Sequence, residues 1–257
     1  MQYTFAYGSP PEARHTGSFL FVVIQMRSYS SLLCHILGSH PEISGSTEAH
    51  QSYSGRADLK RLAATVRAAT GTATLGRYVL DKILHNYAQI APSVLGRPDV
   101  KVRFLVRRPE DTIMSILNMS LAVGHTGQFS DPEHEQVLEY YVTRLQQIDA
   151  YSEQLGRNAL LIEAERLMID TTATLNGLAQ WLNLDQPLSE NYRMFNLTGV
   201  PGYSDPFPNI RAGTVVTDAA QRHRTYVPIA VPQDILARAN AAYTAYWEKL
   251  ASRSDVR

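Results

Sequence analysis

The residues best suited to chemistry occur together in one short polar segment, Arg27-Ser28-Tyr29-Ser30-Ser31. It follows the apolar run Phe19–Ile24 and leads directly into residues with helical spacing. Backbone N–H groups at a helix start attract anions, and a guanidinium with three serine hydroxyls strengthens that attraction. The segment therefore predicts an anion cradle. The alternative is an ordinary capped helix start with an incidental arginine.

Further charged residues stand where two other predicted strands end. Asp81 and Lys82 come directly after Tyr78–Leu80, and Arg107 follows Val100–Val106. In a parallel sheet with covering helices, ligands bind outside the carboxyl ends of the strands. We therefore expect these side chains to gather with the Arg27 segment at one edge of the sheet.

The elements that position these residues alternate between strand and helix. Four short apolar runs predict strands at 19–24, 78–80, 100–106 and 159–162. Amphipathic spacing predicts helices at about 32–37, 54–69, 83–95, 109–117, 133–155, 171–184 and 233–250. Such alternation predicts an α/β fold with a central parallel sheet flanked by helices. The 257 residues fit a single domain spanning 1–257, with its chemical motifs within 19–215 and a C-terminal helix at 233–250.

Composition excludes several classes of partner. The chain has 24 Lys and Arg against 24 Asp and Glu, so its formal net charge is zero. A nucleic-acid binder, or a protein of anionic membrane surfaces, normally has a basic excess. The longest early apolar run, Phe19–Ile24, is far shorter than the ~20 residues of a membrane helix. We expect a cytoplasmic protein without nucleic-acid or membrane partners, and its oligomeric state stays open.

Several familiar motifs are missing. None of the four lysines follows a glycine, so the Gly-Lys of a nucleotide-binding P-loop is absent. The sequence also contains no G-x-G-x-x-G, G-x-S-x-G or H-E-x-x-H. These absences weaken the kinase, dehydrogenase, hydrolase and zinc-protease interpretations.

Four segments in order along the chain resemble the motifs of sulfotransferases that use 3′-phosphoadenosine 5′-phosphosulfate. They are Met26–Leu33 with Gly38–Ile43, then Asp81-Lys82, then Phe104–Asp111 with Ser115, and finally Asp205–Gly213. The resemblance implies a P-loop-NTPase-like sulfotransferase fold. It also implies 3′-phosphoadenosine 5′-phosphosulfate as cofactor, with 3′,5′-adenosine bisphosphate as its product, and no metal.

The resemblance assigns a nucleotide-binding role to residues of three motifs. The 5′-phosphate end would lie at the first motif, the 3′-phosphate at the second, and the last would close over the nucleotide. These residues are Arg27, Ser28, Tyr29, Ser30 and Ser31; Arg107 and Ser115; and Arg211 and Gly213. Tyr29 stands where the family has glycine, so we expect its side chain to point away from the phosphate or the cradle to be altered.

Catalysis of sulfuryl transfer is mostly positioning and charge stabilisation, as in phosphoryl transfer. Lys82 is predicted to neutralise the bridging oxygen, and a general base must take the acceptor proton. Glu48 is the first candidate base because it lies eight residues after His40, as in the protein-tyrosine branch of the family. His50 is the second candidate. Cys34, the only cysteine, does not form a common zinc spacing with the nearby histidines, so no metal is expected.

The acceptor is poorly specified, and a hydroxyl of a soluble small molecule is expected. The loops 124–132 and 197–207 are candidate lids. Two alternatives stay open: a phosphotransferase using the same cradle, and a catalytically inactive relative that binds a nucleotide or a partner.

Overall fold

A computed structural model describes residues 17–123, 133–218, 227 and 229–256. Its centre is one sheet of six strands in the order β2-β3-β1-β4-β5-β6, and every neighbouring pair is parallel. The strands are β1 (Ser18–Ile24), β2 (Ile43–Ser44), β3 (Tyr78–Ile83), β4 (Val100–Val106), β5 (Leu160–Glu163) and β6 (Asp255–Val256). The expected α/β fold with a parallel sheet is confirmed.

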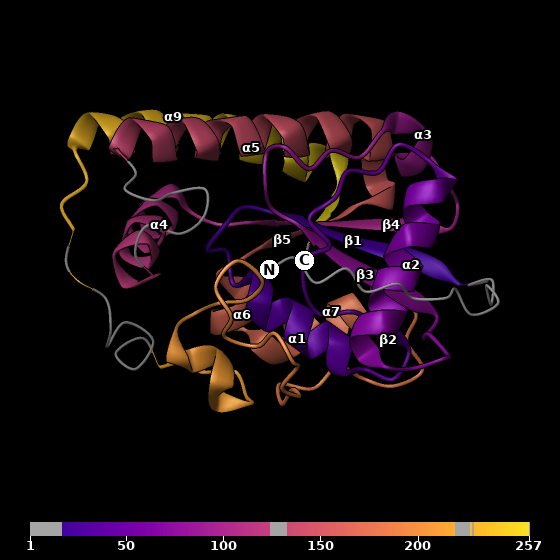
Figure 1. Cartoon of the computed structure of the whole chain (residues 1–257). Helices are drawn as coiled ribbons and strands as arrows, with labels where there is room; N and C mark the ends of the chain where they lie inside the picture. Colours follow the sequence, from indigo (N-terminus) through magenta and orange to yellow (C-terminus); the bar gives the residue numbers. More distant parts are fainter. Residues whose placement is uncertain (1–16, 124–132, 219–226, 228, 257) are drawn as a thin grey trace, which may run out of the picture.

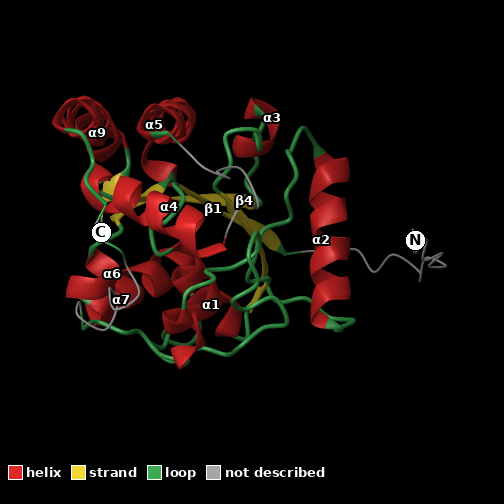
Figure 2. Ribbon diagram, turned by 60° about the vertical axis from the view of Figure 1, so that its left-hand side comes forward, coloured by secondary structure: helices red, strands yellow, loops and turns green. Residues whose placement is uncertain are grey.

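Helices cover both faces of this sheet (Figure 1). They are α1 (Ser30–Ser39), α2 (Arg56–Thr70), α3 (Pro92–Leu95), α4 (Pro109–Val123), α5 (His134–Leu155), α6 (Arg166–Ile169), α7 (Thr171–Leu182) and α9 (Gln233–Arg253). In Figure 2, α5 and α9 lie side by side above the sheet, while α1, α6 and α7 lie below it. In the described part of the chain, no helix is both long and apolar enough to cross a membrane.

The core has two parts because side chains of a strand alternate between the faces of a sheet. Leu20, Val22 and Ile24 of β1 pack in one cluster with α1, α4 and α7. Phe19, Phe21 and Val23 pack in the other with α2, α3 and α5. A strand with both faces covered reads as a continuous apolar run, which is the pattern that predicted β1.

The segment after β3 is where the sequence prediction was wrong. A helix was expected from about residue 83 to 95, but only Pro92–Leu95 is helical. Contacts with distant segments hold the residues between β3 and α3 in a non-helical path. Tyr53 and Ile90 form a parallel bridge, and the Tyr140 hydroxyl donates to the Leu84 carbonyl at 2.8 Å. Asp81 and Lys82 were expected after the strand and instead lie inside it. Strands β2 and β6 were not predicted because two residues carry no periodicity.

Candidate active site

The order of the strands places a switch point at β1. The chain runs from β1 to β3 on one side of it and then to β4 on the other. Outside the carboxyl end of such a strand the following loops diverge and leave a crevice, which is where ligands bind in open α/β sheets. The segments after β1, β3 and β4 therefore meet at the expected edge.

Helix α5 fixes this edge through two buried polar side chains. The Tyr140 hydroxyl accepts from the Met26 N–H at 2.7 Å and donates to the Leu84 carbonyl. The Arg144 guanidinium, which is fully buried, donates to the carbonyls of Ile24 and Ile83. The ends of β1 and β3 are thus tied to one helix, and the loops beyond them start from a rigid base.

The loop after β1 has a backbone that suits an anion cradle. Arg27 and Tyr29 both lie in the left-handed region, with φ of 61° and 59°. The Ser28 hydroxyl turns inward and donates to the Gln25 carbonyl at 2.6 Å. Glycine adopts such a positive φ most easily, so Tyr29 holds a conformation that is uncommon for a residue with a side chain. The tyrosine keeps that backbone conformation and adds a side chain.

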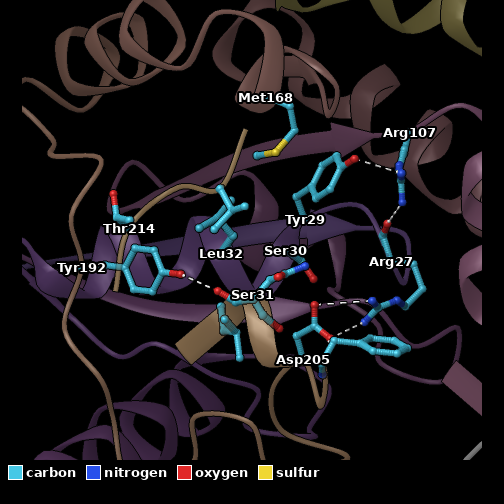
Figure 3. Close-up of a pocket in the computed structure, with 14 residues that line it drawn as sticks. Arg27, Tyr29, Ser30, Ser31, Leu32, Arg107, Met168, Tyr192, Asp205 and Thr214 are labelled. Carbon is cyan, nitrogen blue, oxygen red and sulfur yellow. Dashed lines mark hydrogen bonds and ion pairs between the residues drawn. The ribbon is translucent and has the colours of Figure 1, made fainter. Parts of the chain in front are cut away.

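The Tyr29 side chain points at Arg107, at the end of β4. The Arg107 guanidinium lies over the Tyr29 ring at 4.4 Å and donates to its hydroxyl at 3.0 Å. A second Arg107 N–H group donates to the Arg27 carbonyl at 2.6 Å. Tyr29 therefore contacts the arginine that was predicted to hold phosphate (Figure 3).

Arg27 is also engaged by the protein. Its guanidinium donates to the Ser115 hydroxyl at 2.9 Å and to the Asp205 carboxylate at 2.9 and 3.4 Å. The Phe207 ring lies 5.0 Å from it. Arg27, Arg107 and Ser115, predicted from two separate motifs, thus lie together. Asp205 belongs to the last of the four motifs, but the sequence did not predict its ion pair with Arg27.

Arg27, Arg107, Asp205 and Phe207 line a cavity of about 80 Å³. Its lining comes from the loop after β1, the end of β4 and the loop near residue 210. The lining residues are Arg27, Tyr29, Ser30, Ser31, Leu32, Arg107, Met168, Tyr192, Asp205, Phe207, Asn209, Ile210, Thr214 and Val216. Arg211 and Gly213 are not among them: the Arg211 guanidinium donates to the Gly199 carbonyl at 3.3 Å, and the Gly213 carbonyl accepts from the Tyr192 N–H at 2.9 Å.

The second group of charges centres on Lys82. Its ammonium lies 2.9 Å from Glu48 Oε1 and donates at 3.4 Å to the Ser31 hydroxyl, at the start of α1. In register with Val22, Lys82 faces the α1 side of the sheet. One buried lysine thus connects the cradle loop with the predicted base.

Glu48 is ionised in this environment. Burial would raise the pKa of its carboxyl, but the neighbouring Lys82 ammonium and the His85 imidazole outweigh burial and hold the pKa below its usual 4.5. The group is therefore a carboxylate at neutral pH, as a general base must be.

Asp81 positions Glu48 by binding the backbone of the next residue, Ala49. Its side chain lies on the face opposite Lys82, accepts from the Ala49 N–H at 2.8 Å and from the Tyr53 hydroxyl at 2.6 Å. Burial raises the pKa of Asp81 to about 7. The loop that carries Glu48 begins at Gly45, where φ is +106° and a Cβ would stand 2.6 Å from the Leu80 carbonyl oxygen, so only glycine fits. The sequence did not predict this positioning role.

Two histidines flank Glu48. His85 Nε2 lies 3.1 Å from Glu48 Oε2, and His50 Nδ1 lies 3.8 Å from the same oxygen. His50 was predicted as the second candidate base, whereas His85 was missed. Its place three residues after Lys82 is the one sequence signal that could have found it. Two other histidines near Cys34 in the sequence have different partners. The His35 ring nitrogens form hydrogen bonds with Ser31 and Thr198, and His40 Nε2 forms one with the Gln186 carbonyl.

A second cavity, of about 240 Å³, has Glu48 in its wall. Its lining mixes apolar side chains of α2 with the segment before α2 and the segment 193–197. The lining residues are Gly45, Ser46, Thr47, Glu48, Ala49, Leu62, Thr65, Val66, Ala69, Thr70, Leu80, Asp81, Arg193, Met194, Phe195, Asn196 and Leu197. Of the two predicted lids, 197–207 lies partly in this wall, and 124–132 is outside the described residues.

Comparison with known proteins identifies the fold. No protein-family model and no curated protein sequence matches the chain. Among solved structures, the chain is similar to a sulfotransferase domain from the curacin biosynthetic pathway. The match covers 90% of this chain and 99% of that domain, with a TM-score of 0.58 and 17% sequence identity. The sheet and its helices therefore have the arrangement seen in a sulfotransferase domain.

Proposed function

We propose that the chain is a sulfotransferase that moves a sulfuryl group from 3′-phosphoadenosine 5′-phosphosulfate to a hydroxyl of a small-molecule acceptor. The observation that carries the proposal is the Lys82–Glu48 pair, 2.9 Å apart and joined to the cradle loop through Ser31. A cation and a carboxylate side by side, at the switch point of this fold, are what an in-line transfer needs.

The described residues fit the donor at several points. Ser30 and Ser31, at the start of α1, line the first cavity, and with the N–H groups of that helix start they would hold the 5′-phosphate end. Arg107 is buried, and its guanidinium lies 3.5 Å from the Asp111 carboxylate and 3.9 Å from the Glu165 carboxylate, neither within hydrogen-bond distance of its Nε. Arg107 and Ser115 would hold the 3′-phosphate. Arg27 was predicted at the 5′-phosphate end, and we assign it to the 3′-phosphate instead because it donates to Ser115. The bound donor supplies the activated sulfuryl group.

The chain's own groups then have separate tasks. Glu48 takes the proton of the acceptor hydroxyl at a carboxylate oxygen. Lys82 stabilises negative charge on the oxygen that leaves with the nucleotide, because a cation in a water-poor site acts more strongly than in water. The second cavity is proposed to receive the acceptor, since Glu48 stands in its wall.

Calorimetry with 3′,5′-adenosine bisphosphate tests the donor assignment. We expect binding, and weaker binding of adenosine 5′-monophosphate, because that ligand lacks the 3′-phosphate. Transfer of labelled sulfuryl groups to a simple phenol then tests the reaction. Absence of bisphosphate binding at high micromolar ligand would overturn the proposal.

One observation favours the inactive relative as a second candidate. Asp205 and Tyr29 cover the two arginines that were predicted to bind phosphate. A chain that binds the bisphosphate but sulfates neither a phenol nor a panel of alcohols would be assigned to this class. A phosphotransferase would instead bind ATP in preference to the bisphosphate, and the missing Gly-Lys argues against that result.

A further inference from the structure

Three metal-ligating atoms converge beside the Lys82–Glu48 pair. Glu48, His50 and His85 each offer one ligand atom, and these three atoms all lie within 4.8 Å of one another. Glu48 Oε2 lies 3.1 Å from His85 Nε2 and 3.8 Å from His50 Nδ1. Ligand atoms bound tetrahedrally to zinc at about 2.0–2.2 Å stand roughly 3.4 Å apart. Small side-chain rotations would therefore bring all three atoms to one ion.

We propose that Glu48, His50 and His85 form a binding site for a divalent transition-metal ion of the Zn²⁺ class. Two imidazoles and one carboxylate suit Zn²⁺, Cu²⁺ or Ni²⁺, while Mg²⁺ and Ca²⁺ prefer sites made of oxygen alone. Three protein ligands leave at least one position for water, as in open zinc sites. The histidines and cysteine weighed from the sequence included only one of these ligands, so the site was not predicted.

The local structure holds the ligands in place. Glu48 and His50 follow β2, which pairs with β3, and His85 follows β3, whose end is tied to α5. His50 is held in the left-handed region at φ 50°. The Tyr87 ring stacks on His85 with centroids 5.0 Å apart and an angle of 10° between the planes. The His50 side chain is 31% exposed, which gives an ion a path from solvent.

Lys82 sets the strength of the site. It binds Glu48 Oε1, so Oε2 is the oxygen that faces the imidazoles. Its positive charge repels a dication a few ångströms away and lowers the affinity. An ion on Oε2 would also occupy the carboxylate that the proposed transfer needs, so we expect Zn²⁺ to inhibit transfer. Metal binding itself does not depend on the proposed function.

Titration of the chelator-treated full chain with Zn²⁺, by calorimetry and by competition with a chromophoric chelator, tests the site. We expect one ion per chain in the micromolar range. His50→Gln and His85→Gln should each weaken binding at least about tenfold, the cost of disturbing a metal site. His134→Gln is the matched control, because His134 lies at the start of α5 outside the cluster, and it should bind as the unmodified chain does.

Lys82→Met gives the sharpest outcome, because it should tighten Zn²⁺ binding about tenfold while it lowers any transfer rate. Far-ultraviolet circular dichroism establishes that each variant is folded. Absence of stoichiometric binding, equal affinity in both histidine variants and the control, or Zn²⁺ affinity in Lys82→Met no higher than in the unmodified chain would each overturn the site. Failure of bisphosphate binding with Zn²⁺ binding intact would overturn the proposed function alone.

Discussion

The two ends of the candidate active site differ in how their charges are partnered. At the transfer end, which consists of Glu48, Lys82 and His85, a carboxylate, an ammonium and an imidazole form one compact group. At the phosphate end, which centres on Arg27 and Arg107, each guanidinium is bound by a protein group from elsewhere in the chain.

The difference lies in what a ligand must displace. In the proposed reaction, the transfer end already has the carboxylate of Glu48 ionised beside the Lys82 ammonium, so that an acceptor would meet a preformed pair. The phosphate end must exchange Asp205 and the Tyr29 hydroxyl for phosphate oxygens. Hydrogen bonds to charged groups contribute about 1.5–3 kcal/mol, so this exchange lowers the net affinity for a nucleotide. The charges of the transfer end are already paired with each other, whereas the arginines of the phosphate end are bound by Asp205 and Tyr29 of the chain itself.

The largest effect is expected from Glu48→Gln. The amide keeps the size of the carboxylate but cannot accept the acceptor proton, so the transfer rate should fall by about 10²–10⁴-fold. Binding of 3′,5′-adenosine bisphosphate should change little, because Glu48 does not line the first cavity. Single-turnover sulfation and calorimetry measure the two quantities separately.

The control for this change is Glu139→Gln, on an exposed position of α5, which should leave both quantities unchanged. Unchanged turnover in Glu48→Gln, with His50→Gln inactive, would transfer the role of base to His50.

The second effect tests the phosphate end through Arg107→Lys. Lysine keeps the charge but loses the planar fork, so one charge-assisted hydrogen bond to phosphate is removed. We expect bisphosphate affinity to fall by about 1.5 kcal/mol, roughly tenfold. Arg108→Lys is the matched control, since the neighbouring Arg108 is exposed and paired with Glu163. Equal affinities in both variants would remove Arg107 from the phosphate site.

The third effect has the opposite sign. Asp205→Asn removes the negative charge that pairs with Arg27. It keeps a side-chain oxygen that can accept from the Phe207 N–H, which lies 3.1 Å from the carboxylate in the unmodified chain. An ion pair of this exposure contributes about 1 kcal/mol, so bisphosphate binding should tighten roughly fivefold. Weaker binding would instead mean that Asp205 orders the loop that closes the site.

Sequence reasoning named charged residues at both ends of the site, Arg27 and Arg107 at the phosphate end and Lys82 and Glu48 at the transfer end, but missed His85. Lys82 and Glu48 were predicted, and the structure brings them to 2.9 Å, because strand ends and motif spacing are local features. The α/β fold was predicted for the same reason, through the apolar runs of β1 and β4. The sequence therefore predicted those features that depend on residues close together along the chain.

The missed features depend on contacts between distant segments. Asp205 meets Arg27 across 178 positions, and His85 meets Glu48 from the loop after the next strand. The helix expected after Lys82 gave way to a chain path set by Tyr53 and Tyr140. No local pattern encodes such pairings, because tertiary packing selects among conformations of similar local energy.

The last prediction concerns stability rather than binding or transfer, and it rests on His35, which joins α1 to the segment that borders both cavities. Its Nδ1–H donates to the Ser31 carbonyl at 2.7 Å, so in the neutral ring Nε2 accepts from the Thr198 hydroxyl at 2.8 Å. Burial lowers the pKa of His35 from 6.5 to about 4. The unfolded chain then binds a proton at a pH where the folded chain does not. The resulting stability is present above pH 6.5 and is lost as the pH falls toward 4.

Urea unfolding at neutral pH and near pH 4.5 measures this loss, which we expect to be about 2 kcal/mol from His35 alone. Other groups also titrate in this range, so the informative quantity is the difference between the unmodified chain and His35→Gln. The variant should be less stable at neutral pH, where it lacks the native pair of hydrogen bonds, and the difference should shrink in acid. Parallel pH profiles would show that His35 does not take up the proton, and the anchoring of Thr198 to α1 would then be independent of pH.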